Sequence, residues 1–265
     1  MLIICKSLRI AHVVIHFGQY RVQEPTACRF QTNVITVGQV MPDVERMNPI
    51  TDISETIRAW IGTIFAEPDH RSHSWQHCHT FFQNAGQAGL RVQRDHAALH
   101  LGFYLASWGM YRGSSFLIKH SYTVHREIID LLTTPESAPL WDNDVVLEDN
   151  AQRIHTIIEV TNAIKRTYHR FGKASDTLVT KILLGTTGCM PACDRYFIAG
   201  FKDAGFKYSS VNQQFIEHVF RFCEDNKAEL RGEQDRILRE HQAYYPIMKL
   251  VDMYFNERGA TSDSP

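Results

Sequence analysis

Residues 97–118 read AALHLGFYLASWGMYRGSSFLI, and this stretch decides the fold. Apolar residues lie on every side of about its first fourteen positions when these are placed on a helix, which predicts one buried helix. Small residues recur at helical spacing and form a stripe that lets a second helix backbone approach closely, namely Gly102, Ala106, Gly109 and Gly113. Because a glycine inside a helix costs about 1 kcal/mol relative to alanine, two interior glycines indicate a packing or site constraint.

From Met47 onward the rest of the chain keeps a helical pattern. Apolar residues recur at spacings of three and four, and glycine, proline and capping residues separate the segments. The expected helices begin near Ser54, Ser74, Ala97, Thr123, Asn150, Ser175, Pro191, Ser210 and Glu233. The pattern predicts an all-α fold, a single domain of about eight to ten helices over residues 47–265.

Residues 1–46 differ from the rest, because they hold β-branched runs and no helical period. Two interpretations stay open for them. They are either an N-terminal extension outside the folded unit, or a short β-hairpin or arm that packs on its body.

Composition and the absence of known motifs weigh against several classes of function. The net charge of −1 gives no general attraction to nucleic acid or to an anionic membrane, although a local basic patch remains open. Six scattered cysteines form no disulfide framework, so we expect reduced thiols and a cytoplasmic protein. No apolar run reaches the length of about 18 residues that a membrane helix needs, and no segment reads as a signal peptide. The glycine-rich nucleotide motifs and the kinase signatures are absent, and we predict no cofactor.

The strongest candidate for chemistry is the block over residues 173–197. It predicts a helix that carries Lys181, a glycine-bearing turn, and a second helix with Asp194 in its first turn. An amine and a carboxylate brought together in this way suit a nucleophile with an electrostatic or acid–base partner. Backbone N–H groups near Gly188 could hold a phosphate. The alternative is a solvated lysine and an aspartate that only favours the helix start.

Residues 97–118 carry a second stripe, of side chains with polar tips. Its members, with Trp108 and Arg112 beside them, could line a ligand pocket: His100, Tyr104, Ser107 and Tyr111. They could equally be buried polar groups that are satisfied within the fold.

Two further clusters favour ordinary structural roles. His73 and His77 lie four residues apart on one helix face, but metal ligation needs three converging ligands, so we predict no metal site. Cys189 and Cys193 lack the two-residue spacing of a redox or zinc pair, and we expect buried, inert thiols.

Two blocks resemble known sequences. LHLGFYLASWGMYRGSSFLI (99–118) and LVTKILLGTTGCMPACDRYF (178–197) resemble blocks of uncharacterised bacterial all-helical proteins, over about residues 74–220. The second block is also distantly similar to helix-hairpin-helix DNA glycosylases. That resemblance implies a lysine and a downstream aspartate acting on a flipped base, roles that fall on Lys181 and Asp194. The chain departs from the family, because its hairpin reads Gly-Thr-Thr-Gly instead of Gly-x-Gly and the spacing from lysine to aspartate is short.

Three functions follow from these observations. The first is a nucleic-acid-directed enzyme of base-excision glycosylase or lyase type, in which Tyr104, Trp108 and Tyr111 stack on a base. The second is a helical module that binds another protein through an exposed apolar patch. The third is a small-molecule or metal-binding helical protein. The sequence leaves the oligomeric state open.

Overall fold

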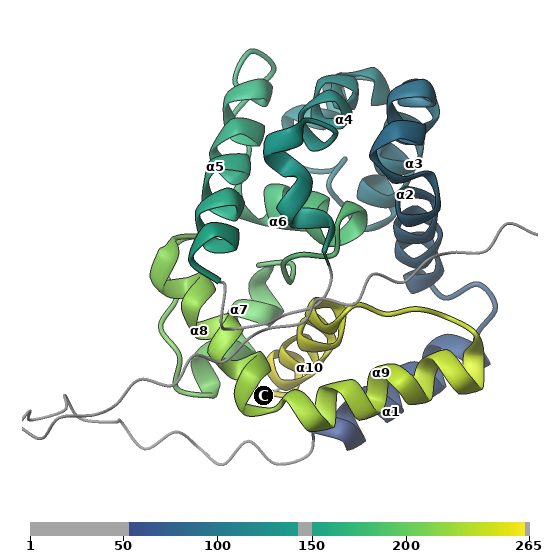
Figure 1. Cartoon of the computed structure of the whole chain (residues 1–265), viewed down its shortest axis with the longest axis vertical. Coiled ribbons are helices and arrows are strands. Elements are labelled where there is room, and N and C mark those ends of the chain that lie inside the picture. Colours follow the sequence, from purple (N-terminus) through teal and green to yellow (C-terminus); the bar gives the residue numbers. More distant parts are fainter. Residues whose placement is uncertain (1–52, 143–149, 263–265) are drawn as a thin grey trace, which may run out of the picture. The chain divides into compact units, whose positions relative to one another are not determined.

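The computed structural model describes residues 53–142 and 150–262, which belong to one compact unit, Val44–Pro265. These residues form helices and no strand, so the all-α prediction is confirmed. The α-helices of the described residues are α1 Ile53–Ala66, α2 Ser72–Val92, α3 Arg94–Ser107, α4 Arg126–Leu132, α5 Asn150–Tyr168, α6 Asp176–Thr186, α7 Arg195–Asp203, α8 Gln213–Asp225, α9 Lys227–His241 and α10 Ile247–Ser262 (Figure 1). Three short 3-10 helices accompany them: η1 Phe116–Lys119, η2 Tyr122–His125 and η3 Pro135–Trp141.

The expectations for the N-terminal residues and for membrane helices have different outcomes. Residues 1–46, for which two interpretations were given, lie outside the described residues. Among the helices that are described, none has both the length and the apolar character that crossing a bilayer requires.

The helices form two groups that meet in the middle of the unit (Figure 1). In one group α2 packs on α3 and α6, and α4 packs on α3 and α5. In the other group α10 packs on α7, α9 and α1. Aromatic rings fill the space between α7, α8 and α10, and these rings are fully or almost fully buried: Phe197, Phe201, Phe215, Phe222 and Phe255.

The central helix begins and ends about three residues earlier than predicted, and it is less buried. α3 ends at Ser107, and its end is closed by hydrogen bonds from Gly109 N–H to the Ala106 carbonyl (3.0 Å) and from Met110 N–H to the Leu105 carbonyl (2.8 Å). Gly109 is therefore the left-handed residue that stops the helix, with φ +74°, and the small-residue stripe does not continue beyond it. The expectation of burial on every side is also wrong, because α3 has an exposed apolar face: Leu99 is 50% exposed and Phe103 is 59% exposed.

The capping residues of α7 and α8 differ from those predicted. Pro191 lies in a non-helical segment, and α7 begins four residues later with Asp194 as its N-cap. Asn212, not Ser210, caps α8, because its side-chain oxygen accepts the Phe215 N–H at 2.9 Å. Ser175 caps α6 as predicted, accepting the Leu178 N–H at 3.2 Å.

α7 and α10 touch backbone to backbone at two glycines. A Cβ atom added at Gly200 would lie 2.1 Å from the Phe255 carbonyl oxygen, and one added at Gly259 would lie 1.9 Å from the Tyr196 carbonyl oxygen. Because the obstructing atoms belong to the main chain, neither side could move aside without separating the two helices.

We therefore expect Gly200→Ala to lower the free energy of unfolding by about 3 kcal/mol, through overpacking against backbone that cannot yield. Gly232→Ala in α9 is the matched control, since a Cβ atom there meets nothing within 4 Å. It should be neutral or stabilise by up to about 1 kcal/mol, as alanine favours a helix over glycine. Urea denaturation followed by circular dichroism measures both, and equal effects of the two variants would contradict the proposed contact.

Candidate functional site

The predicted amine and carboxylate lie together. Lys181 Nζ donates to Asp194 Oδ2 at 3.1 Å, and the ion pair is mostly enclosed, with side-chain exposures of 4% for the lysine and 21% for the aspartate. The second carboxylate oxygen, Oδ1, accepts the N–H groups of Tyr196 and Phe197, each at 3.2 Å. Asp194 therefore caps α7 with one oxygen and binds Lys181 with the other.

Two threonines hold the connecting segment against α6. Thr177 Oγ1 donates to the Cys193 carbonyl at 2.8 Å, and Thr180 Oγ1 accepts the Cys193 N–H at 2.8 Å. Because these residues lie within one turn of Lys181, they fix the following residue, Asp194, opposite the lysine. Cys193 itself is buried, and burial raises the pKa of its thiol, so the thiol stays protonated and inert.

Trp108 provides an aromatic face beside the pair. It follows the last residue of α3, and Lys181 Nζ lies 4.9 Å from the centroid of its ring. The Arg71 guanidinium carbon lies 4.6 Å from the same centroid. Both distances fall within the range of cation–π attraction, so the indole is held by the charged groups around it.

A second amine–carboxylate pair, which the sequence analysis missed, lies next to the first. Lys249 and Asp252 are three residues apart on α10, their charged atoms are 2.7 Å apart, and their side chains are 2% and 5% exposed. Asp252 also accepts the Ala192 N–H at 3.0 Å, which ties α10 to the segment that leads to Asp194. The signal for this pair was a lysine and an aspartate inside the apolar run IMKLVDMYF at 247–255.

Three indole rings surround Lys249. Its Nζ lies 5.8 Å from the ring centroid of Trp60, 5.1 Å from that of Trp75 and 5.3 Å from that of Trp108. A small void of about 10 Å³ is bordered by both ion pairs and by Trp60 and Trp108. The two ammonium groups thus belong to one aromatic-walled site.

A cavity of about 470 Å³ lies on the outer side of this site. Its size falls in the range of small-ligand pockets. Aromatic side chains in its wall are Trp60, Trp108 and Tyr196. Cationic residues outnumber acidic ones in its lining, with Arg71, Arg112, Lys181 and Arg195 against Asp194 and Glu257. The cavity therefore favours a ligand with an aromatic part and negative charge.

Of the predicted ligand residues, Trp108 and Arg112 line this cavity and Tyr104 borders the small void behind it. The Tyr104 ring is buried over Gly185, where an added Cβ atom would lie 2.3 Å from the ring. Burial, together with the charge of Asp252, raises the pKa of its phenol, which stays neutral. Tyr104 is thus part of the wall and has no open face on which a base could stack.

The other predicted ligand residues point elsewhere, and none of them lines the cavity. His100 stacks on Phe81 with ring centroids 3.9 Å apart. The Ser107 hydroxyl donates to the Tyr104 carbonyl at 2.8 Å. The hydroxyl of Tyr111 lies 2.7 Å from Nε2 of a buried histidine, His125.

Gly188 also lacks the role predicted for it. Its N–H donates to the Leu183 carbonyl at 2.8 Å, and its φ of +70° ends α6. No helix begins at Gly188, so the backbone donor expected to hold a phosphate there is already used.

Histidine, cysteine and acidic side chains do not converge on a metal site within residues 53–142 and 150–262: no group of three or more could hold an ion. His73 Nε2 lies 3.1 Å from the Glu67 carbonyl, and the His77 ring lies 4.9 Å from that of His100.

No protein-family model matches the chain, and neither a curated protein nor a solved structure matches it. The likeness to helix-hairpin-helix glycosylases therefore stays a prediction, carried by Lys181, Asp194 and the hairpin between them.

We expect Asp252→Asn to lower the free energy of unfolding by about 3–5 kcal/mol, because it leaves the Lys249 ammonium buried without its counter-charge. Asp203→Asn is the matched control: its partner Arg258 lies at 2.6 Å, but the aspartate is 42% exposed. That change should cost at most about 1 kcal/mol. Lys249→Met should partly restore the Asp252→Asn variant. Urea denaturation of the four proteins measures this, and equal losses for the two aspartate variants would refute the buried pair's importance.

Proposed function

We propose that this chain is a nucleic-acid-directed enzyme of base-excision glycosylase or lyase type, with Lys181 as its nucleophile. The observation that carries the proposal is the Lys181–Asp194 pair at 3.1 Å beside an aromatic-walled cavity with an excess of cationic residues. A desolvated amine next to a carboxylate suits covalent catalysis on an electrophilic carbon.

The chemistry proceeds through an imine. Asp194 Oδ2 accepts a proton from the Lys181 ammonium, and the freed amine lone pair attacks C1′ of the target nucleotide. The bond from C1′ to the base breaks, its electron pair leaves with the base nitrogen, and that nitrogen takes a proton from solvent. The attached nitrogen loses its second proton to solvent, and the sugar ring then opens as the Asp194 carboxyl gives its proton to the ring oxygen. The nitrogen lone pair forms the C1′=N bond to Lys181. Water later hydrolyses this bond, or a lyase step follows from it.

The aromatic side chains of the cavity suit a nucleotide base that has been flipped out of the helix. Flipping a nucleotide costs a few kcal/mol, least for a damaged or mismatched base. Stacking on an aromatic side chain returns about 1–3 kcal/mol per base. Trp60, Trp108 and Tyr196 supply such side chains at the cavity.

Borohydride trapping tests the proposal, since reduction of the imine fixes the protein to its substrate. We expect an adduct with oligonucleotides that carry an abasic site or a damaged base, and none with Lys181→Met. Asp194→Asn should slow trapping by about 100-fold or more, within the range of acid–base catalysis. This variant keeps α7 capped, because asparagine caps a helix as well as aspartate does.

Two further variants make the test specific. Lys249→Met shows whether the deeper amine takes part, and Lys202→Ala, on the exposed end of α7, should trap like the wild type. Thermal melting by circular dichroism verifies that each variant is folded. The absence of an adduct across abasic, deaminated, oxidised and alkylated substrates would remove the proposal.

One observation favours a second candidate, a helical protein-interaction module. Leu99 and Phe103 lie one turn apart on α3 and are 50% and 59% exposed. Apolar side chains exposed together are typical of binding surfaces. If this candidate is correct, a Leu99→Ser/Phe103→Ser variant should lose a partner that the wild type retains in a pull-down, while the melting temperature stays unchanged. A pull-down with no specific partner would count against it.

A further inference from the structure

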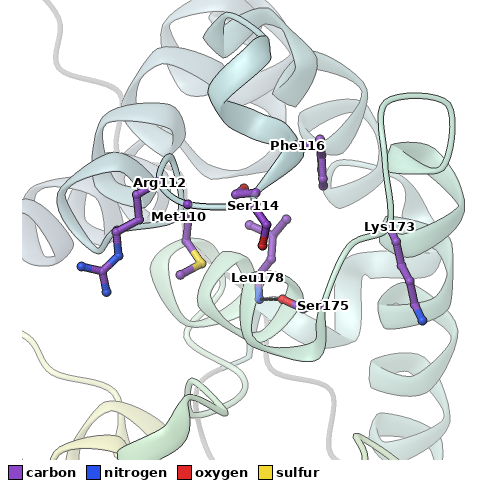
Figure 2. Close-up of a pocket in the computed structure, with 10 residues that line it drawn as sticks. Met110, Arg112, Ser114, Phe116, Lys173, Ser175 and Leu178 are labelled. Carbon is purple, nitrogen blue, oxygen red and sulfur yellow. Dashed lines mark hydrogen bonds between the residues drawn. The ribbon is translucent and has the colours of Figure 1, made fainter.

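A second cavity, of about 610 Å³, lies beside the first. Its walls come from the loop after α3, residues 109–116, and from the start of α6 with the residues before it, 173–178. The two cavities share Met110 and Arg112 as lining residues, so they are neighbours along one surface. Figure 2 shows Arg112 and Lys173 at opposite ends of the second cavity, with Ser114 between them.

The lining of this cavity suits an anion. Arg112 and Lys173 line it and no acidic residue does. Both side chains are exposed, and within the part of the chain that the structure describes neither belongs to an ion pair. A cation outside an ion pair keeps more of its attraction for a ligand's charge than a paired one does.

Serine hydroxyl groups in the lining provide further hydrogen-bond donors beside these cationic side chains. Ser115 and Ser175 each use the side-chain oxygen to accept a backbone N–H, from Leu117 at 3.3 Å and from Leu178 at 3.2 Å. Their hydroxyl protons remain free to point at an anion in the cavity, as a hydroxyl both donates and accepts.

Two glycines make close contacts at the walls of the cavity. Arg112 crosses over Gly109, where an added Cβ atom would lie 2.7 Å from the arginine Nε. The Phe116 side chain lies on Gly172, where an added Cβ atom would be 2.5 Å from the Phe116 Cβ and 2.6 Å from its ring carbon Cγ. Gly172 is therefore required for the segment before α6 to approach the loop after α3, while Arg112 folds back over Gly109 of its own loop.

We propose that this second cavity binds the phosphodiester backbone of the nucleic-acid strand whose target nucleotide occupies the first cavity. The inference rests on the proposed function and adds the substrate class: a polymer strand, recognised by phosphates beside the reacting sugar. Arginine, lysine and serine side chains are the usual phosphate contacts, and such contacts set the register of a strand without reading its sequence. A neighbouring phosphate held here would fix the sugar against Lys181.

Salt-dependent binding of a single-stranded oligonucleotide to the full chain tests this. Fluorescence anisotropy gives the association constant at a series of KCl concentrations. Each phosphate contact on a single strand contributes about 0.7 to the slope of log K against log salt. We expect Arg112→Ala/Lys173→Ala to make the slope shallower by about 1.4. The matched control, Lys202→Ala/Arg221→Ala, removes two exposed cations that line neither cavity, and should keep the wild-type slope.

The outcomes separate this inference from the proposed function. An unchanged slope in Arg112→Ala/Lys173→Ala, in a protein that still forms the borohydride adduct, overturns the inference alone. A shallower slope without any adduct supports the strand site and removes the glycosylase or lyase proposal. Inorganic phosphate at matched ionic strength should displace the oligonucleotide no better than KCl, and stronger displacement would assign the cavity to free phosphate and overturn the inference.

Discussion

One carboxylate connects the fold of this protein to its candidate chemistry. Asp194 uses Oδ1 to close the start of α7 and Oδ2 to hold the Lys181 ammonium. Because the capping geometry fixes the carboxylate in space, the lysine finds its counter-charge in place when α6 and α7 pack. The Thr177 and Thr180 bonds to Cys193 help to place Asp194, and the cost of enclosing a charged amine is offset by a partner that the helix start has already positioned.

Local patterns in the sequence were enough for the fold class and for the existence of most helices. They were not enough to place the helix ends, because hydrogen bonds formed in the folded chain decide among several suitable residues. Gly113 and Gly109 are equally good stop residues by sequence, and only the closing bonds to Ala106 and Leu105 select Gly109. Pro191 suits the first position of a helix, but the Thr177 and Thr180 bonds to Cys193 hold the segment in an extended form until Asp194.

The candidate site could likewise be predicted only in part from local sequence. Lys181 and Asp194 could be paired from sequence because a short hairpin brings them together. The environment of Lys249 could not be predicted, since its three indoles come from Trp60, Trp75 and Trp108, far apart in the sequence, and meet at α10 only in the folded chain. The polar stripe predicted on residues 97–118 does not form one wall of a pocket. Because α3 ends at Ser107, Tyr111 does not continue the helix face that carries His100 and Tyr104.

The glycine contact between α7 and α10 has a consequence for motion. The two backbones touch there, so sliding or tilting of one helix against the other would break this contact, and Asp194 and Asp252 lie on its two sides. An opening of the first cavity to a large ligand would therefore disturb fewer contacts at the other wall. That wall is the loop after α3, where left-handed glycines at 109 and 113 flank Arg112 and give the backbone freedom that the α7–α10 block lacks. Access to the amine would then be governed by the element that carries Trp108, while the acidic groups stay stationary.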